Sequence, residues 1–243
     1  MHRRQVLAAL AGAVAVTPAL MRAASGQPMS DATQSAAFKR FRFSFFDDPN
    51  SARDGLDEAA LAELSGEERE RAEGMLIAFL PDSRAIIGLG VLRSRLAEPQ
   101  LMRLFTTERA LAAGQLPDEF YNAYQLVYLA TALWRIRPDP RWVEAITDVL
   151  ARSGEWTSRQ EAAMALYAIR APAAEAALTK ALDDPQGLVR HHASRALLAL
   201  HGTGSQMNPT DMTIRIMSED AARREGGKRD ILSAIEGRPI TLP

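Results

Sequence analysis

Apolar residues in the second half of the chain recur with the spacing of one face of an α-helix, and the same stretch occurs twice. Residues 158–169 align with residues 189–200, and Arg159 matches Arg190 at an offset of 31 (190 − 159). At the same offset, Ala162, Ala165, Leu166 and Ile169 match Ala193, Ala196, Leu197 and Leu200. These positions are i, i+3, i+4 and i+7, so each copy is predicted to be an amphipathic helix with one buried face.

A second helix is predicted to follow this pattern, which makes the repeating unit a helix pair. Residues 132–137 match residues 165–170 at an offset of 33 (165 − 132), and a proline, Pro138 or Pro172, follows each stretch. We expect proline to start the second helix, where its missing N–H costs nothing. The predicted second helices are residues 142–150 and 173–182, and residues 183–187 form the turn that closes the repeat.

A weaker copy lies upstream, where the apolar residues 84–92 precede a second apolar stretch at 101–105. Gly88 and Gly90 occupy packed positions of this copy. Each glycine weakens a helix by roughly 1 kcal/mol relative to alanine. Because glycine lacks a Cβ atom, we expect these two positions to let neighbouring backbones approach closely.

The pattern Asp-Pro-x-x-x-Val-Arg-x-x-Ala-x-x-Ala-Leu-x-x-Leu at residues 184–200 resembles HEAT repeats, in particular those of the bilin-lyase-like HEAT family. The resemblance extends over about residues 70–202 and implies an all-α fold, a short HEAT-like α-solenoid of stacked antiparallel helix pairs. It also implies a scaffold or adaptor role, although a few relatives are enzymes or assist cofactor attachment. The physical argument agrees, because one helix pair cannot bury its apolar face alone and must stack on neighbours.

The segments that flank the array have less regular patterns. Alternating phenylalanines in residues 38–48 predict a strand or an extended segment on the first repeat. Helices are expected over 56–64 and 66–79, the latter capped by Ser65 with Glu68 three residues later.

The C-terminal flank is predicted to close the stack. Residues 202–210 have the composition of a linker, and Ser218 is expected to cap a last helix that Gly226-Gly227 interrupts before Ile235. This helix would cover the open end of the array. The predicted organisation has four parts. Residues 1–28 are an export signal, and residues 29–69 are an N-terminal extension with a first helix. Residues 70–202 are the HEAT-like array, and residues 203–243 are a linker with a capping helix.

The first residues have the three parts of an export signal: a basic start, a short apolar stretch and a cluster of small residues. Arg3-Arg4-Gln5-Val6-Leu7 resembles the twin-arginine export motif, so the protein is expected to be exported to the periplasm without stable membrane insertion after cleavage. Two alternatives are an uncleaved membrane anchor and a cytoplasmic protein whose translation starts at Met29.

Composition excludes several classes of function. The chain has no cysteine, which excludes disulfides, thiol nucleophiles and Fe–S clusters. Its 243 residues include 29 Lys+Arg and 30 Asp+Glu. Removing residues 1–25 takes away three arginines and leaves 26 basic against 30 acidic residues, a net charge of −4. A negative chain does not favour binding to a phosphate backbone, so no nucleic-acid partner is expected.

The remaining motifs do not form a catalytic, metal or cofactor site. His191 and His192 are adjacent on a predicted helix, so their imidazoles point about 100° apart and cannot readily share a metal. No Gly-x-Ser-x-Gly elbow occurs, and Gly88-Leu89-Gly90 lacks the third glycine of a phosphate loop. We therefore expect no enzyme activity, with a HEAT-type lyase or cofactor-handling accessory protein as the alternative.

One face of the array carries the candidate function. By its resemblance to HEAT units, the helix with the Val-Arg-x-x-Ala motif is the inner, concave helix. Its non-core positions form three rows across the repeats: Tyr128, Glu161 and His192; Thr131, Met164 and Arg195; and Trp134, Tyr167 and Leu198. Aromatic, Met and Arg side chains are enriched at protein interfaces. These rows predict binding of an unidentified protein partner, and the alternative for the third row is packing between repeats.

Overall fold

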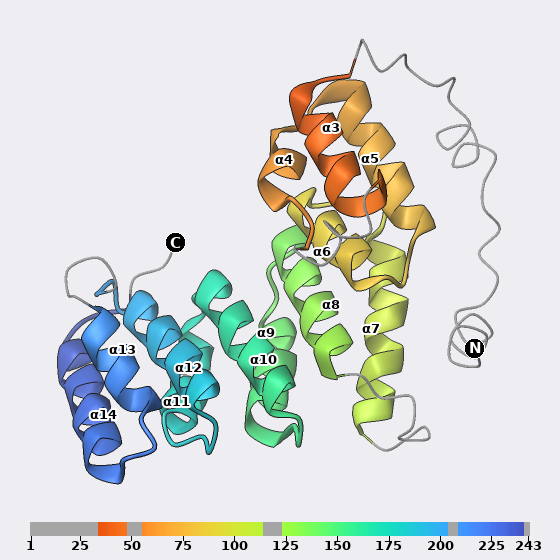
Figure 1. The fold of residues 1–243 in the computed structure, drawn as a ribbon. Coiled ribbons are helices and arrows are strands. Elements are labelled where there is room, and N and C mark those ends of the chain that lie inside the picture. The colour runs from red at the N-terminus through yellow and green to blue at the C-terminus, as the bar shows by residue number, and fades with distance from the viewer. Residues whose placement is uncertain (1–33, 48–54, 114–122, 204–208, 241–243) are drawn as a thin grey trace. The chain divides into compact units, whose positions relative to one another are not determined.

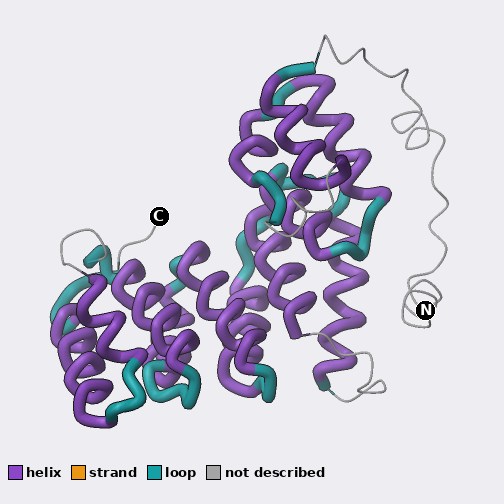
Figure 2. Tube along the Cα trace, viewed as in Figure 1, coloured by secondary structure: helices purple, strands orange, loops and turns teal. Residues whose placement is uncertain are grey.

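The structure is a computed structural model that describes residues 34–47, 55–113, 123–203 and 209–240. Within these ranges all regular elements are helices and no strand occurs, as Figure 2 shows by colour. Helices that are close in the sequence pack against one another, which is consistent with an all-α solenoid of helix pairs (Figure 1). The predicted export signal lies outside the described residues.

The α-helices follow one another along the chain with short connections. They are α3 (Ala36–Arg42), α4 (Glu58–Glu63), α5 (Gly66–Ala78), α6 (Ser83–Val91), α7 (Glu98–Ala112), α8 (Ala123–Ile136), α9 (Pro140–Arg152), α10 (Trp156–Ile169), α11 (Glu175–Ala181), α12 (Gly187–Leu200), α13 (Pro209–Met217) and α14 (Ala221–Ile235). A π-helical turn, Phe43–Asp47, continues α3, and a 3-10 turn, Pro172–Ala174, precedes α11.

The chain divides into two compact units that share α8. The first unit is Met1–Tyr121 with Thr131–Pro138, and the second is Asn122–Ala130 with Asp139–Pro243. In the second unit α9 packs on α10, α10 on α12, α12 on α13, and α13 on α14, while α11 contacts both α9 and α12. This order of contacts is that of helix pairs stacked along one direction.

The predicted apolar face of the repeats forms the core of the second unit. Ala162, Leu166, Ala193 and Leu197 each have at most 1% of their surface exposed. Ile169 is also buried. The spacing i, i+4 places such residues on one side of each helix. The prediction of the core is confirmed at these positions, whereas Ala165 is only half-buried.

A buried ion pair joins successive repeats. Arg159, at the start of α10, donates from Nε and Nη2 to the two carboxylate oxygens of Asp184 at 2.7 and 3.0 Å. The two side chains are only 12% and 8% exposed. Two parallel hydrogen bonds between a guanidinium and a carboxylate fix orientation as well as charge. The matching arginines found in the sequence therefore connect one helix pair to the turn of the next.

Glycine permits the close packing predicted for the upstream copy. A Cβ atom at Gly90 would lie 2.8 Å from the Cα atom of Ala132 in α8. A Cβ atom at Gly88 would lie 2.9 Å from Leu76. Any larger residue at Gly90 would therefore push α6 away from the backbone of α8.

The N-terminal phenylalanine segment is helical, so the prediction of a strand or extended segment was wrong. The Oγ atom of Ser35 accepts a hydrogen bond from the amide of Phe38 at 3.0 Å and caps α3. Phe38, Phe41 and Phe45 are buried, whereas Phe43 is 53% exposed. The buried rings thus follow the helical spacing i, i+3, i+7 instead of the alternation of a strand.

At one helix start the cap differs from the prediction, and at another the first residue differs: α5 begins at Gly66 as predicted, but without the expected cap hydrogen bond. Ser65 precedes α5 but its side chain makes no cap hydrogen bond, and Glu68 accepts instead from the amide of Ser35 at 2.7 Å. In the next case, α9 begins at Pro140 rather than at Pro138, because Asp139 accepts from the amide of Arg141 and caps the helix.

The C-terminal flank contains a further helix. The sequence predicted a linker up to residue 210 and one interrupted helix, whereas the structure has α13 and a continuous α14. Asp220, not Ser218, caps α14 by accepting from the amide of Arg223 at 2.7 Å. The helix continues through Gly227. A Cβ atom at this position would lie 2.8 Å from the backbone nitrogen of Ile216, so the glycine lets α13 approach α14 closely.

Candidate partner-binding face

The predicted site residues fall on three helices, α8, α10 and α12, of which α10 and α12 pack side by side. The structure places them at different depths: Tyr128, Thr131, Trp134, Glu161 and His192 are half-buried, Met164, Tyr167 and Arg195 are exposed, and Leu198 is buried. Thr131 and Trp134 belong to the first unit, and the others belong to the second. The members of this set that are not buried and belong to the second unit, together with Tyr124 and Arg170, are termed the α8–α10–α12 face. Its residues are Tyr124, Tyr128, Glu161, Met164, Tyr167, Arg170, His192 and Arg195.

Leu198 is a member of the hydrophobic core. Only 2% of its surface is exposed, and its backbone carbonyl accepts hydrogen bonds from the amide and the hydroxyl of Thr203 at 2.9 Å each. A buried side chain offers no surface to a partner, so Leu198 is removed from the predicted contact residues. For this member of the third row, packing inside the protein is the correct interpretation.

Tyr167 is the centre of a cationic cluster. The guanidinium carbon of Arg195 on α12 lies 5.3 Å from the centroid of the Tyr167 ring, and that of Arg170 lies 6.0 Å away. Both distances fall within the range of cation–π attraction. The ring is still 38% exposed, and Met164, one turn earlier on α10, is 40% exposed. The cluster therefore combines apolar surface with two positive charges.

An acidic and aromatic cluster lies at the other end of the face. Tyr124 and Tyr128 are one turn apart on α8, and their rings stack with centroids 6.5 Å apart. Burial raises the pKa of Tyr128 to about 12, and the negative charge of Glu161 on α10 adds to this rise. Burial also raises the pKa of the Glu161 carboxyl. In the described part of the chain, no cation pairs with Glu161.

The two histidines of α12 do not supply that missing charge. Burial is the main cause that lowers the pKa of His191 and of His192, and the nearby positive charge of Arg195 lowers both further. An ordinary histidine has a pKa of about 6.5, so both imidazoles are neutral at pH 7. Their rings meet edge to face, with centroids 5.1 Å apart. Among the described residues no group of three or more His, Asp or Glu is arranged to hold a metal.

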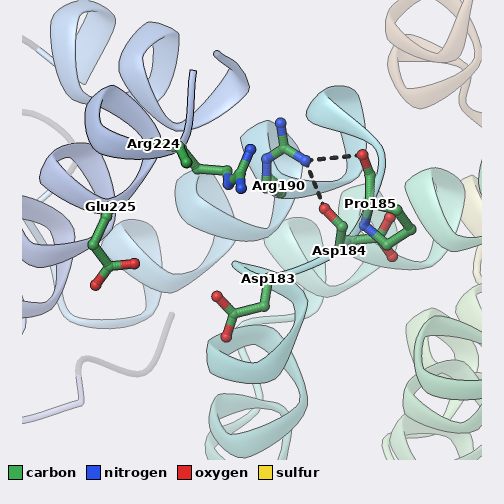
Figure 3. A pocket seen from close by; sticks show the side chains of 7 residues that line it. Asp183, Asp184, Pro185, Arg190, Arg224 and Glu225 are labelled. Atoms are coloured by element: carbon green, nitrogen blue, oxygen red, sulfur yellow. Dashed lines mark hydrogen bonds between the residues drawn. The ribbon is translucent and has the colours of Figure 1, made fainter. Parts of the chain in front are cut away.

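A polar pocket of about 450 Å³ lies elsewhere in the second unit. Its lining residues are Asp183, Asp184, Pro185, Arg190, Ala221, Arg224 and Glu225 (Figure 3). Lys228 contacts both carboxylate oxygens of Asp183 at 2.6 and 2.7 Å, and Arg159 occupies the carboxylate of Asp184. These carboxylates are already engaged in holding helices together.

Arg190, which lines that pocket, has a structural role. It is 2% exposed, and its guanidinium donates to backbone carbonyls on two sides. The acceptors are those of Asp184, Pro185, Ile216, Met217 and Ser218, at 2.6–3.3 Å. It therefore satisfies carbonyls at the C-terminal end of α13 and in the turn before α12. The sequence showed the repeated arginine but not this role, because the acceptors are main-chain atoms.

His201 also has a structural role. Its Nε2 atom lies 3.1 Å from a carboxylate oxygen of Glu175 on α11, and its Nδ1 atom lies 3.1 Å from the carbonyl oxygen of Arg238. The side chain is 6% exposed. His201 therefore ties the residues after α14 to the helix pair α11–α12.

The packing described above defines the class of the protein, an α-solenoid of helix pairs. Residues 121–198 match the family model of HEAT repeats, which supports a HEAT-repeat protein. That segment contains α8 to α11 and most of α12. No curated protein and no solved structure matches the chain.

This family has a general consequence for function. HEAT repeats commonly serve as scaffolds for protein interactions, and their fold is typically not enzymatic. The exposed part of the α8–α10–α12 face is consequently the candidate binding surface.

A separate finding concerns membranes: across the described ranges, the helices are too short or too polar for any of them to cross a bilayer.

Proposed function

We propose that this protein is a non-catalytic interaction module, a scaffold, adaptor or assembly factor, that binds a partner protein on the α8–α10–α12 face. By the HEAT resemblance, this is the concave face of the solenoid. The observation that carries the proposal is the composition of the surface there: Tyr167 and Met164 are exposed beside Arg195, and none of the described residues places a cation on Glu161. Aromatic, Met and Arg side chains contribute most to binding at protein interfaces.

The N-terminal sequence supports a place of action. The twin-arginine-like motif and the short apolar stretch in residues 1–28 support export, so we propose that the partner is met in the periplasm. If translation starts at Met29, the partner is cytoplasmic.

A second candidate is a HEAT-type lyase or cofactor-handling accessory protein, for which the resemblance to the bilin-lyase-like family is the support. The polar pocket around Arg190 is the one feature that favours it, because it combines arginines with carboxylates. The binding module is preferred, since Arg190 and Asp184 bond within the protein, whereas a substrate pocket needs polar groups that converge on a ligand.

Photo-crosslinking tests the proposed function. A photoreactive residue replaces Met164 on the face, or Lys180, an exposed residue of α11, as the matched control. We expect a specific adduct with one partner protein from position 164 and no such adduct from position 180. The same adduct from both positions, or none from position 164, would contradict the assignment of this face.

A double substitution gives a second test. Tyr167→Ala with Arg195→Ala removes the cationic cluster from exposed positions, so we expect an unchanged far-UV helical signal and loss of partner capture. A loss of helicity would show that the two residues hold the fold together and do not form a binding surface.

A further inference from the structure

The α8–α10–α12 face has two poles of opposite charge. Glu161 provides the negative pole next to the stacked rings of Tyr124 and Tyr128. Arg195 and Arg170 provide the positive pole around Tyr167. Glu161 and Tyr167 are six residues apart on α10, so they are separated by about 9 Å along the helix axis and by about 120° around it.

Among the described residues, the negative pole has no partner within the protein. Glu161 is half-buried and, within the described residues, makes no hydrogen bond or ion pair. His192 lies in its predicted row and is neutral at pH 7, since burial lowers its pKa. The guanidinium of Arg195 on α12 lies over the ring of Tyr167. A partly desolvated carboxylate without a counter-charge is unfavourable, and a cation from outside would relieve it.

The surroundings of Glu161 select the kind of cation. Tyr128 is close enough to Glu161 for the carboxylate to raise its pKa, and its ring stacks with that of Tyr124. Such rings attract ammonium and guanidinium groups. A lysine or arginine side chain also carries an apolar stem that can pack on these rings while its charged end reaches the carboxylate.

The positive pole sets the second requirement. Arg195 and Arg170 flank an exposed ring, and a carboxylate that approached Tyr167 would meet both guanidinium groups. An extended peptide rises by about 3.3 Å per residue, so three residues cover the distance of about 9 Å along the axis. The rotation around the helix makes the full distance between the poles longer, so a connecting peptide needs at least three residues.

From these contacts we infer that the partner of the α8–α10–α12 face presents a segment in which a lysine or arginine enters the Glu161–Tyr128–Tyr124 cluster and an acidic residue at least three positions away meets Arg195 and Arg170. This inference rests on the proposed function, because it describes the chemistry of the same surface. It adds the charge order that a partner segment must have.

Selection from a random peptide library on the full chain tests the inference. We expect the enriched peptides to share a basic residue with an acidic residue at least three positions away. Their affinities are then measured by fluorescence polarisation with wild-type protein, with Glu161→Gln and with Glu144→Gln, which removes an exposed carboxylate of α9 as a matched control. We expect Glu161→Gln to weaken binding by about tenfold or more, and Glu144→Gln to leave it unchanged.

A substitution in the peptide covers the case in which Glu161→Gln affects the fold. Replacing the shared basic residue of the peptide by methionine leaves the protein untouched and should cause a similar loss of affinity. With Glu161→Gln the same peptide change should have little further effect, since the two charges act as a pair.

The outcomes separate this inference from the proposed function. Peptides that crosslink at position 164 but share no basic residue, or that bind Glu161→Gln as tightly as wild type, would overturn the charge order and leave the face as a binding surface. If no peptide is enriched and position 164 forms no adduct with a partner, both the inference and the proposed function are refuted.

Discussion

Two adjacent glycines in α14 allow the same substitution to be made in two different environments. A Cβ atom added at Gly226 meets no atom within 4 Å. A Cβ atom added at Gly227 lies 2.8 Å from the backbone nitrogen of Ile216 and 3.1 Å from the carbonyl carbon of Arg215. Both glycines are inside the helix, and neither has a positive φ, so alanine fits the backbone at both.

The two alanine variants should therefore change stability in opposite directions. Replacing glycine by alanine inside a helix stabilises it by about 1 kcal/mol, and Gly226→Ala should show this gain. At Gly227 the new methyl group must move from 2.8 Å to an ordinary contact of 3.4 Å, a shift of about 0.6 Å against main-chain atoms of α13. Overpacking of this kind costs about 1–3 kcal/mol, so Gly227→Ala should be neutral or destabilising by up to about 2 kcal/mol.

Urea denaturation followed by far-UV circular dichroism measures both effects. Gly226→Ala should raise the midpoint and Gly227→Ala should not, with a difference between them of about 1–3 kcal/mol. In a thermal scan this corresponds to about 2–4 °C for each kcal/mol in a chain of this size. Equal stabilisation by both substitutions would refute the close approach of α13 to α14 on which this reasoning depends.

Three further predictions concern the second unit. Asp184→Asn leaves the buried guanidinium of Arg159 without its counter-charge and should destabilise by about 3–5 kcal/mol in urea denaturation, whereas a gain or no change would show that the pair is not needed. Leu197→Ala creates a cavity in the core and should cost about 2–5 kcal/mol by the same measurement, against a small effect of Leu188→Ala at a 40% exposed position. Because the pKa of His192 is lowered in the folded state, the unfolded chain takes up protons first as the pH falls below about 6.5, so stability should decrease there. His192→Gln should make that decrease smaller, and an unchanged pH profile would contradict the assignment.

The core of the repeats could be predicted from the sequence because each position occurs twice. Ala162 and Ala193, or Leu166 and Leu197, are equivalent at one offset and are all buried. A coincidence in one helix would not recur at the same register in the next. The glycine at position 90 was also predictable, since a small residue at a packed position indicates a close contact.

The flanking helices could not be predicted in the same way, because their apolar residues alternate. Phe41, Phe43 and Phe45 follow the spacing i, i+2, i+4, which indicates a strand. The first and last positions of this pattern are also neighbours on a helix face. Phe41 and Phe45 are buried and Phe43 is exposed, so the helix uses only the i, i+4 pair.

The same ambiguity hid α13. Met212, Ile214 and Ile216 alternate in the sequence, yet Met212 and Ile216 are buried and Ile214 is 56% exposed. Threonine and isoleucine do not favour a helix strongly by themselves. The contacts with α12 and α14, and the hydrogen bonds from Arg190 to the carbonyls at its end, stabilise the helix. Tertiary packing therefore decides between strand and helix in these segments.

For the candidate face, register predicts where a residue lies around a helix but not how deeply it is covered. Tyr167 and Leu198 are equivalent by an offset of 31 (198 − 167), yet Tyr167 is 38% exposed and Leu198 is 2% exposed. The difference follows from the helices that surround them, since α12 packs on α10, α11 and α13 and buries nearly every position of its second half. The charge of the face has a similar origin. In the described part of the chain Glu161 has no cation, since Arg195 lies over Tyr167 and burial keeps His192 neutral, and both conditions arise from packing between helices. The charge order that a partner must match is therefore a property of the stacked repeats as a group.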